Sequence, residues 1–152
     1  DFRINDYASY RGLLIMTGIN TDVKEGKHIF RSEDGKAAVW AGVIDDLWKL
    51  GKPVGQGGPW KNDSVKPGEP SDPYLIGFYD RKTLEISHNS VEPVTFNIQV
   101  ESIGHGPWMD YMQITVPSGD TYKYQFPENF QTRWIRFISD KTCIATTWLE
   151  YK

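Results

Sequence analysis

The chain has 152 residues, of which 39% are hydrophobic, so it is long enough for a globular domain with a buried core. Its net charge is −3 and it has no run of basic residues, which argues against a nucleic-acid partner. The longest apolar runs, such as residues 13–16, are too short to span a membrane. Cys143 is the only cysteine, which excludes an internal disulfide and a sulfur-ligated zinc cluster, and we expect it on a buried strand.

In the first third of the chain, turn residues separate short apolar runs. The apolar run from residue 12 to residue 18 predicts a buried strand. Residues 28–31 and 37–43 flank a turn that contains Asp-Gly, which is a strong hairpin signal. Residues 44–50 favour one helical turn, since two leucines lie three positions apart. The stretch from Gly51 to Pro73 is rich in glycine and proline and predicts a long irregular loop.

Regular strands follow this loop. They are expected at residues 74–79, 83–88, 94–101, 110–116, 122–126, 133–139 and 144–151. In all, about nine strands with turn signals roughly every ten residues predict an all-β fold, an antiparallel β-sandwich of the jelly-roll, galactose-binding-like type with one long ordered loop. We expect a single domain over residues 1–152; the alternative is that residues 1–18 end a preceding domain.

The segment from Trp40 to Trp60 combines indole rings, carboxylates, ammonium groups and glycines. Indole faces stack on the C–H faces of sugars, while charged side chains bind the hydroxyl groups. The segment and its neighbours therefore predict a saccharide-binding site, in which Trp48 and Trp60 stack on the ligand. The predicted ligand-binding residues are Trp40, Asp45, Asp46, Trp48, Lys49, Trp60, Lys61 and Arg81. The alternative is that Trp48 and Trp60 fold inward and close the end of the sandwich.

A second aromatic cluster lies in the later strands and could line the sandwich end. It consists of His105, Trp108, Tyr111 and Trp134. The loop over residues 104–108 contains two glycines and a proline, and it predicts an exposed indole at the tip of a turn.

The adjacent carboxylates Asp45 and Asp46 allow three interpretations. A glycosidase needs two carboxyl groups roughly 5–10 Å apart across a cleft. Asp side chains with loop carbonyls also suit calcium. In the third interpretation Asp45 caps the short helical turn, and Asp46 pairs with Lys49 or Arg81.

No catalytic motif is recognisable. The histidines, His28, His88 and His105, are scattered, and we expect each to be solvent-facing or hydrogen-bonded. Residues 55–58 resemble a phosphate loop in composition only, because no helix with a Lys-Ser or Lys-Thr pair follows. The sequence therefore predicts no catalytic residue, cofactor or metal site. The enzymatic alternative is a small polysaccharide lyase or hydrolase that uses Asp45 or Asp46 with His88 or His105.

Three stretches, residues 7–14, 34–61 and 70–80, resemble the C-terminal region of long secreted proteins from polysaccharide-degrading bacteria. The Asp-Asp-Leu-Trp-Lys-Leu-Gly-Lys-Pro stretch is the most specific, and the resemblance covers nearly the whole chain. It implies a fragment of a longer protein, in which residues 7–14 close a propeller-like part and a β-sandwich follows. It assigns no catalytic residue. The last two strands also resemble those of galactose-binding jelly rolls.

Together these observations favour a non-catalytic accessory module of a secreted glycan-active protein that binds carbohydrate. Besides the enzyme, the alternative is a purely structural or interdomain docking module. The expected partners are carbohydrate or a neighbouring domain of the same polypeptide. The expected location is secreted, periplasmic or on the cell surface.

Overall fold

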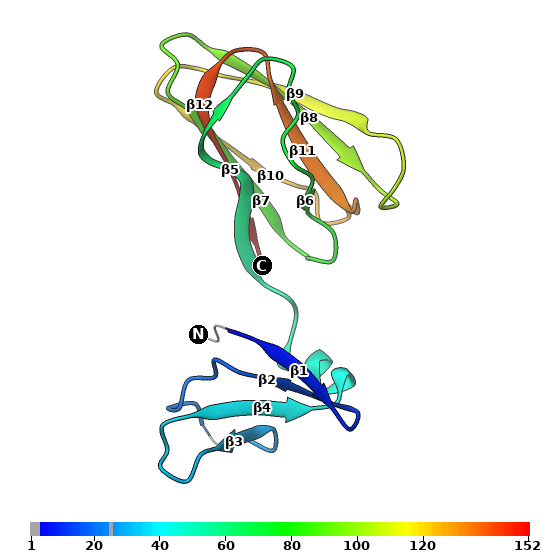
Figure 1. Ribbon diagram of the computed structural model, residues 1–152. Coiled ribbons are helices and arrows are strands. Elements are labelled where there is room, and N and C mark those ends of the chain that lie inside the picture. Colours follow the sequence, from blue (N-terminus) through cyan, green and yellow to red (C-terminus); the bar gives the residue numbers. More distant parts are fainter. Residues whose placement is uncertain (1–3, 25) are drawn as a thin grey trace. The chain divides into compact units, whose positions relative to one another are not determined.

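The computed structural model describes residues 4–24 and 26–152, which form twelve strands and one short 3₁₀ helix (Figure 1). The chain divides into two compact units, one ending at Gly51 and the other beginning at Lys52. No helix within the described residues is both long and apolar enough to cross a membrane.

The first unit is a four-stranded antiparallel sheet with the order β1-β2-β4-β3. Its elements are β1 (Tyr7–Tyr10), β2 (Leu13–Met16), β3 (Ile29–Arg31), β4 (Ala38–Gly42) and the 3₁₀ helix η1 (Ile44–Leu50). The β3–β4 hairpin and η1 confirm two predictions from the sequence. The expected buried strand is only partly buried, because Leu13 is exposed and Met16 packs with Trp40 in a small core.

The second unit is a sandwich of two four-stranded sheets. Its strands are β5 (Gly55–Val65), β6 (Tyr74–Leu75), β7 (Lys82–His88), β8 (Val94–Glu101), β9 (Met109–Val116), β10 (Thr121–Gln125), β11 (Trp134–Ser139) and β12 (Cys143–Tyr151). One sheet has the order β10-β7-β12-β5, the other β6-β11-β8-β9, and every pairing is antiparallel. This interleaved order is that of a jelly roll, which confirms the predicted fold class.

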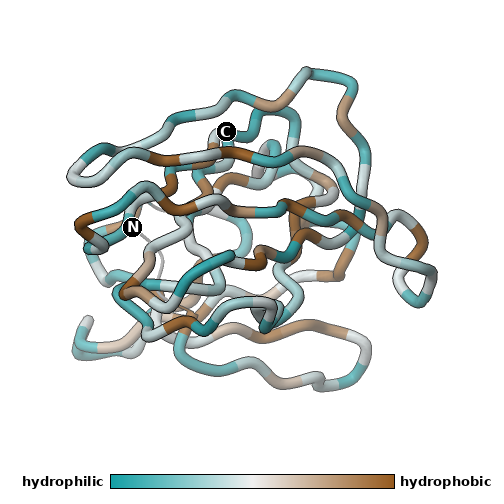
Figure 2. Tube along the Cα trace, turned by 90° about the horizontal axis from the view of Figure 1, so that it is seen from above, coloured by the Kyte–Doolittle hydropathy of each residue, from teal (hydrophilic) through white to brown (hydrophobic). Residues whose placement is uncertain are grey.

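Alternating side chains build the core of the sandwich. In β8, Phe96 and Ile98 are fully buried, whereas Asn97 between them and Gln99 after them point outward. Figure 2 shows this alternation of hydrophobic and hydrophilic residues along the strands. Cys143 is buried on β12, as predicted, and burial raises the pKa of its thiol, so the side chain acts as a small hydrophobe.

The expected irregular loop over residues 51–73 instead contains β5, the longest of the described strands. This strand, β5, pairs with β12 through two register shifts. Gly58 is needed there, because a Cβ atom at this position would lie 1.7 Å from the carbonyl oxygen of Thr147. The glycines thus allow close approach of two strands, a use that composition alone does not distinguish from a loop.

The sandwich occupies a smaller part of the chain than the expected residues 1–152. Its strands all lie after residue 52, and β1 to β4 pair only among themselves in the described ladders. The described part of the predicted preceding domain, residues 4–18, is not separate from the residues that follow, because β2 pairs with β4 through Leu14 and Gly42. The boundary therefore lies after η1 rather than near residue 18.

Candidate functional site

The eight ligand-binding residues predicted from the sequence divide between the two units. Trp40, Asp45, Asp46, Trp48 and Lys49 belong to the first, and Trp60, Lys61 and Arg81 belong to the second.

In the first unit, Trp48 alone presents a free indole. Its side chain is 82% exposed, whereas Trp40 is buried with its ring stacked on His28 at a centroid distance of 5.3 Å. Trp40 therefore has no free face for a ligand, and this part of the prediction is wrong.

The Asp46 carboxylate stabilises the start of η1. It accepts hydrogen bonds from Lys49 Nζ at 2.6 Å and from the Val43 backbone N–H at 3.1 Å. These bonds, the one from Lys49 above all, hold the pKa of Asp46 below its ordinary value despite partial desolvation. The predicted pairing with Lys49 is confirmed, but the capping carboxylate is Asp46 and not the exposed Asp45.

In the second unit, Trp60 is a core residue. It is only 8% exposed, and its ring lies 6.4 Å from Phe96 and 6.1 Å from Phe137, between centroids. The alternative that Trp60 folds inward is therefore correct, and its predicted stacking on a ligand is wrong.

The other two predicted residues of this unit lie apart from the core. Lys61 extends over the Trp148 ring, with Nζ 4.8 Å from the ring centre. Arg81 pairs through its backbone with Lys152 and lines a small depression beside Asp80. Neither residue joins a group of several polar and aromatic side chains.

Two of the three histidines are held by hydrogen bonds, and His105 is exposed. His88 is buried, with Nε2 2.9 Å from the Val116 carbonyl oxygen, while its Nδ1 accepts the backbone N–H of Ser90 at 3.1 Å. Both ring nitrogens of His88 are occupied, so it cannot act as a general base without breaking these bonds. Across residues 4–24 and 26–152, no three His, Cys, Asp or Glu side chains are grouped to hold a metal ion.

A different surface collects the residues that could bind a ligand. It is the outward face of the sheet β6-β11-β8-β9, where strand alternation places polar side chains opposite the buried ones. Antiparallel pairing sets Arg136 of β11 beside Gln99 of β8, and Gln99 beside Asp110 of β9. We call this surface the indole face, defined by Asn97, Gln99, Trp108, Asp110, Trp134 and Arg136.

A chain of hydrogen bonds fixes the polar side chains of the indole face. Arg136 Nε donates to Gln99 Oε1 at 2.7 Å, and Gln99 Nε2 donates to Asp110 Oδ1 at 2.8 Å. Asn97 Nδ2 donates to the same Asp110 oxygen at 2.7 Å. The two amide donors hold the pKa of Asp110 below its ordinary value, so the carboxylate stays ionised. The network is thus arranged before any ligand arrives.

Two indoles flank this network. Trp108 and Trp134 are half-buried and line a hollow of about 440 Å³, together with Pro73, Glu101 and residues 104–106. The guanidinium carbon of Arg136 lies 4.3 Å from the centre of the Trp108 ring. This contact orients the indole beside the polar groups.

The loop that carries His105 and leads to Trp108 is organised by Glu101. Its carboxylate oxygens accept the backbone N–H groups of Ile103, Gly104 and Gly106 at 2.7–2.9 Å. Burial raises the pKa of Glu101, but these N–H donors and the nearby His105 outweigh it, so the pKa lies below its ordinary value of 4.5. Glu101 therefore positions the wall of the hollow, and both of its carboxylate oxygens are engaged by backbone N–H groups of this loop.

A second hollow, of about 250 Å³, lies toward the other end of the same strands. It is lined by Pro67, Gly68, Thr95, Asn97, Gln113, Ile138, Ser139 and Asp140. Trp134 and Ile138 are four residues apart on β11, so the distance between the two hollows is roughly 13 Å along the strand. The indole face is thus elongated and connects two depressions.

Sequence reasoning found part of this site. Three of the four residues of the second aromatic cluster line the larger hollow, but Tyr111 turns inward and its hydroxyl lies 2.8 Å from that of Tyr124. Arg136, Asp110 and the two amides were missed. The one signal was the alternation of β8, which marks Asn97 and Gln99 as outward-facing.

Comparison with known proteins gives no family. No family model and no curated protein sequence matches the chain. One similar solved structure is the crystal structure of PirA, with a TM-score of 0.39 and 16% identity over 65% of this chain and 93% of that chain. Another is a CBM4 structure, with a TM-score of 0.28 and 13% identity over 98% of this chain and 73% of that chain. Both TM-scores are low, so neither likeness assigns a function.

Proposed function

We propose that the indole face binds carbohydrate and that the chain is a non-catalytic module of a secreted, glycan-active protein. The observation that carries the proposal is the combination of two half-buried indoles and a fixed Arg–Gln–Asp–Asn network beside one hollow. This location replaces the site that the sequence predicted around residues 40–61.

The chemistry of the face suits a sugar ring. A pyranose offers a C–H face that stacks on an indole, and hydroxyl groups that both donate and accept hydrogen bonds. Trp108 and Trp134 supply the indoles, Arg136 supplies donors, and Asp110 supplies acceptor lone pairs. Because the side chains already hold one another, ordering them on binding costs little entropy.

The carboxylates of this face argue for binding rather than catalysis. A glycosidase acid must stay protonated near neutral pH, which requires a raised pKa. Glu101 and Asp110 both have lowered pKa values, because hydrogen-bond donors hold their ionised forms. Neither can serve as the proton donor, and the enzymatic alternative finds no support at this face.

One observation favours the docking alternative for the first unit. Trp48 is 82% exposed and Ile44 is 67% exposed on the short helix η1. Exposed apolar side chains of this size suit contact with a neighbouring domain. A Trp48→Ala variant of a longer chain containing the neighbouring domains would then lose interdomain protection from proteolysis.

The carbohydrate proposal is tested by titration calorimetry against a panel of plant and microbial polysaccharides. Trp134→Ala should weaken binding by about 1–2 kcal/mol, or roughly five- to thirtyfold, because stacking area is lost. Trp148→Ala is the matched control, because this indole is half-buried on the outward side of the other sheet. Equal losses in both variants, or no heat with any polysaccharide, would refute the proposal.

A further inference from the structure

We infer that the glycan bound by the indole face carries anionic substituents, carboxylate or sulfate groups, and that Arg136 and Arg133 bind them. This inference rests on the proposed carbohydrate function. Its basis is that these two guanidinium groups lack an acidic partner at a face whose carboxylates are already held by other groups.

The guanidinium of Arg136 is oriented but not neutralised. Its Nε donates to Gln99 Oε1, and its central carbon lies over the Trp108 ring. Among residues 4–24 and 26–152, none of the ion pairs within 4.0 Å involves Arg136. The terminal nitrogens of Arg136 keep donors in the planar arrangement that matches a carboxylate or sulfate group.

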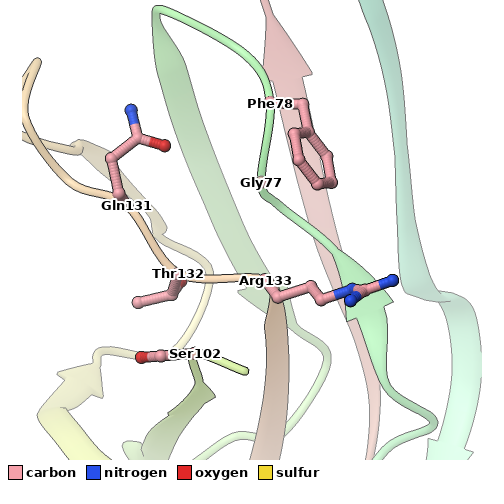
Figure 3. A pocket seen from close by; sticks show the side chains of 6 residues that line it. All are labelled: Gly77, Phe78, Ser102, Gln131, Thr132 and Arg133. Atoms are coloured by element: carbon pink, nitrogen blue, oxygen red, sulfur yellow. The ribbon is translucent and has the colours of Figure 1, made fainter. Parts of the chain in front are cut away.

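Arg133 lies next to the same hollow. It directly precedes β11, and its Nη1 would lie 2.9 Å from a Cβ atom added at Gly104, which lines the larger hollow. Arg133 also lines a neighbouring depression of about 220 Å³ with Phe78 and Thr132. Figure 3 shows the side chains of Arg133 and Phe78 extending to the same side of this depression. The described ion pairs do not include Arg133 either.

The acidic side chains of this region are held by other groups. Glu101 accepts three backbone N–H groups, and Asp110 accepts two side-chain amides. Asp140, at the far hollow, accepts the backbone N–H of Thr95 at 2.8 Å. Each negative charge thus has donors within the protein, while the two arginines retain donors for an external anion.

On the opposite sheet of the sandwich, two cations already have acidic partners. Lys123 is paired with Glu85 at 2.6 Å, and Lys152, which follows β12, with Glu150 at 3.3 Å, whereas Lys61 of β5 extends over the Trp148 ring without an acidic partner among the described residues. The net charge of the chain is −3, so nonspecific attraction of polyanions to the whole protein is not expected. The guanidinium groups of Arg136 on the indole face and Arg133 beside it therefore indicate a positioned anion contact.

The test uses the whole chain and two matched pairs of polysaccharides in calorimetric titrations. The first pair is polygalacturonate and its fully methyl-esterified form, and the second is dextran sulfate and dextran. We expect about tenfold tighter binding of the charged member of at least one pair. The pair that shows the difference identifies the anion as carboxylate or sulfate.

Variants connect that difference to the arginines. Arg136→Gln should remove most of the preference for the charged glycan, whereas Arg136→Lys should retain part of it, because the charge stays and the planar fork is lost. Lys123→Gln, on the opposite sheet, is the matched control and should change nothing. Should Arg136→Gln fail to fold, Arg136→Lys and Arg133→Gln supply the same comparison.

Two outcomes would overturn the inference. Equal affinity for the charged and neutral members of both pairs would overturn it and leave the carbohydrate proposal intact. A preference for the charged member that survives Arg136→Gln and Arg133→Gln would also overturn it. Absence of heat with all four polymers and with the wider panel would overturn both the inference and the proposed function.

Discussion

The two outward faces of the sandwich differ in how their charged groups are used. On the sheet β10-β7-β12-β5, Lys123 is paired with Glu85, and Lys61 extends over the ring of Trp148. On the sheet β6-β11-β8-β9, Arg136 meets a neutral amide and an indole, and a hollow lies beside them. The first face resembles an ordinary solvated surface, and the second retains donors for a ligand.

The inward-facing side chains of the two sheets do not differ in this way. Leu84 and Ile86 of β7 are as completely buried as Phe96 and Ile98 of β8, because both sheets contribute to one core. The fold therefore accounts for the stability of the second unit but not for its function. Outward side chains, which the core leaves unconstrained, carry the difference between the two faces.

The largest expected effect is on the core that both faces share. Trp60 extends from β5 to Phe96 and Phe137 of the opposite sheet, so Trp60→Ala should lower the free energy of unfolding of the sandwich by about 3–5 kcal/mol. Chemical denaturation followed by circular dichroism measures this. Trp48→Ala, at a position 82% exposed, is the control and should cost at most about 0.5 kcal/mol. A smaller loss for Trp60→Ala than for Trp48→Ala would contradict the packing of the Trp60 ring against Phe96 and Phe137.

A smaller loss of stability is expected at β5, the edge strand of the sheet β10-β7-β12-β5. Gly58→Ala places a Cβ atom against the Thr147 carbonyl, so β5 must shift away from β12, at a cost of about 1–3 kcal/mol. Gly55→Ala is the matched control in the same strand, because its Cβ atom would meet Tyr151 at an ordinary 3.8 Å. The same denaturation series compares them. If the two variants were equally stable, the register of β5 would need revision.

The next largest effect on stability is expected at Glu101, beside the indole face, and it depends on pH. The lowered pKa of Glu101 means that the unfolded chain takes up its proton first as the pH falls. The stabilisation by this carboxylate is therefore complete above pH 4.5 and is lost as the pH falls through the lower, folded-state pKa. Glu101→Gln should remove this dependence, and we expect a smaller loss than for Gly58→Ala.

The measurement for Glu101 is the free energy of unfolding of both proteins as a function of pH. The difference between wild type and Glu101→Gln should be constant at neutral pH and shrink in acid. Glu69→Gln is the control, because this exposed carboxylate makes only a 3.5 Å contact with Lys66. A difference that does not change with pH would show that Glu101 does not hold the loop by its charge.

The sequence predicted the framework better than the site. The spacing of strands and turns predicted the jelly roll, whereas the alternation along β8, which separates its core residues from the outward Asn97 and Gln99, did not by itself mark a site. Trp48 and Trp60 occur in one polar and glycine-rich stretch and look equivalent there. Their burial differs because Trp60 meets rings from distant strands, which no local pattern reveals.

The same physical reason, contact with distant strands, explains why the sequence did not predict Arg136 and Asp110 as site residues. Arg136 reaches Trp108 only because β11 pairs with β8 and the loop after β8 folds back over the sheet. Asp110 comes opposite Gln99 through a register shift after Ile98, a bulge that the sequence does not mark. Contacts between residues far apart in the chain define this site, and each depends on strand register.

The smallest expected effect on stability is on the outward face of the sheet β10-β7-β12-β5, where Glu85 accepts a hydrogen bond from Lys123 at 2.6 Å. Lys123 is largely exposed and Glu85 about half exposed, so water screens the pair, and Glu85→Gln should not measurably change either stability or glycan affinity at neutral pH. Gln99→Ala is the matched change at the indole face, where it breaks the link between Arg136 and Asp110 and should weaken glycan binding. Calorimetry of both variants compares the faces directly. A loss of affinity in Glu85→Gln with none in Gln99→Ala would assign ligand binding to the opposite sheet.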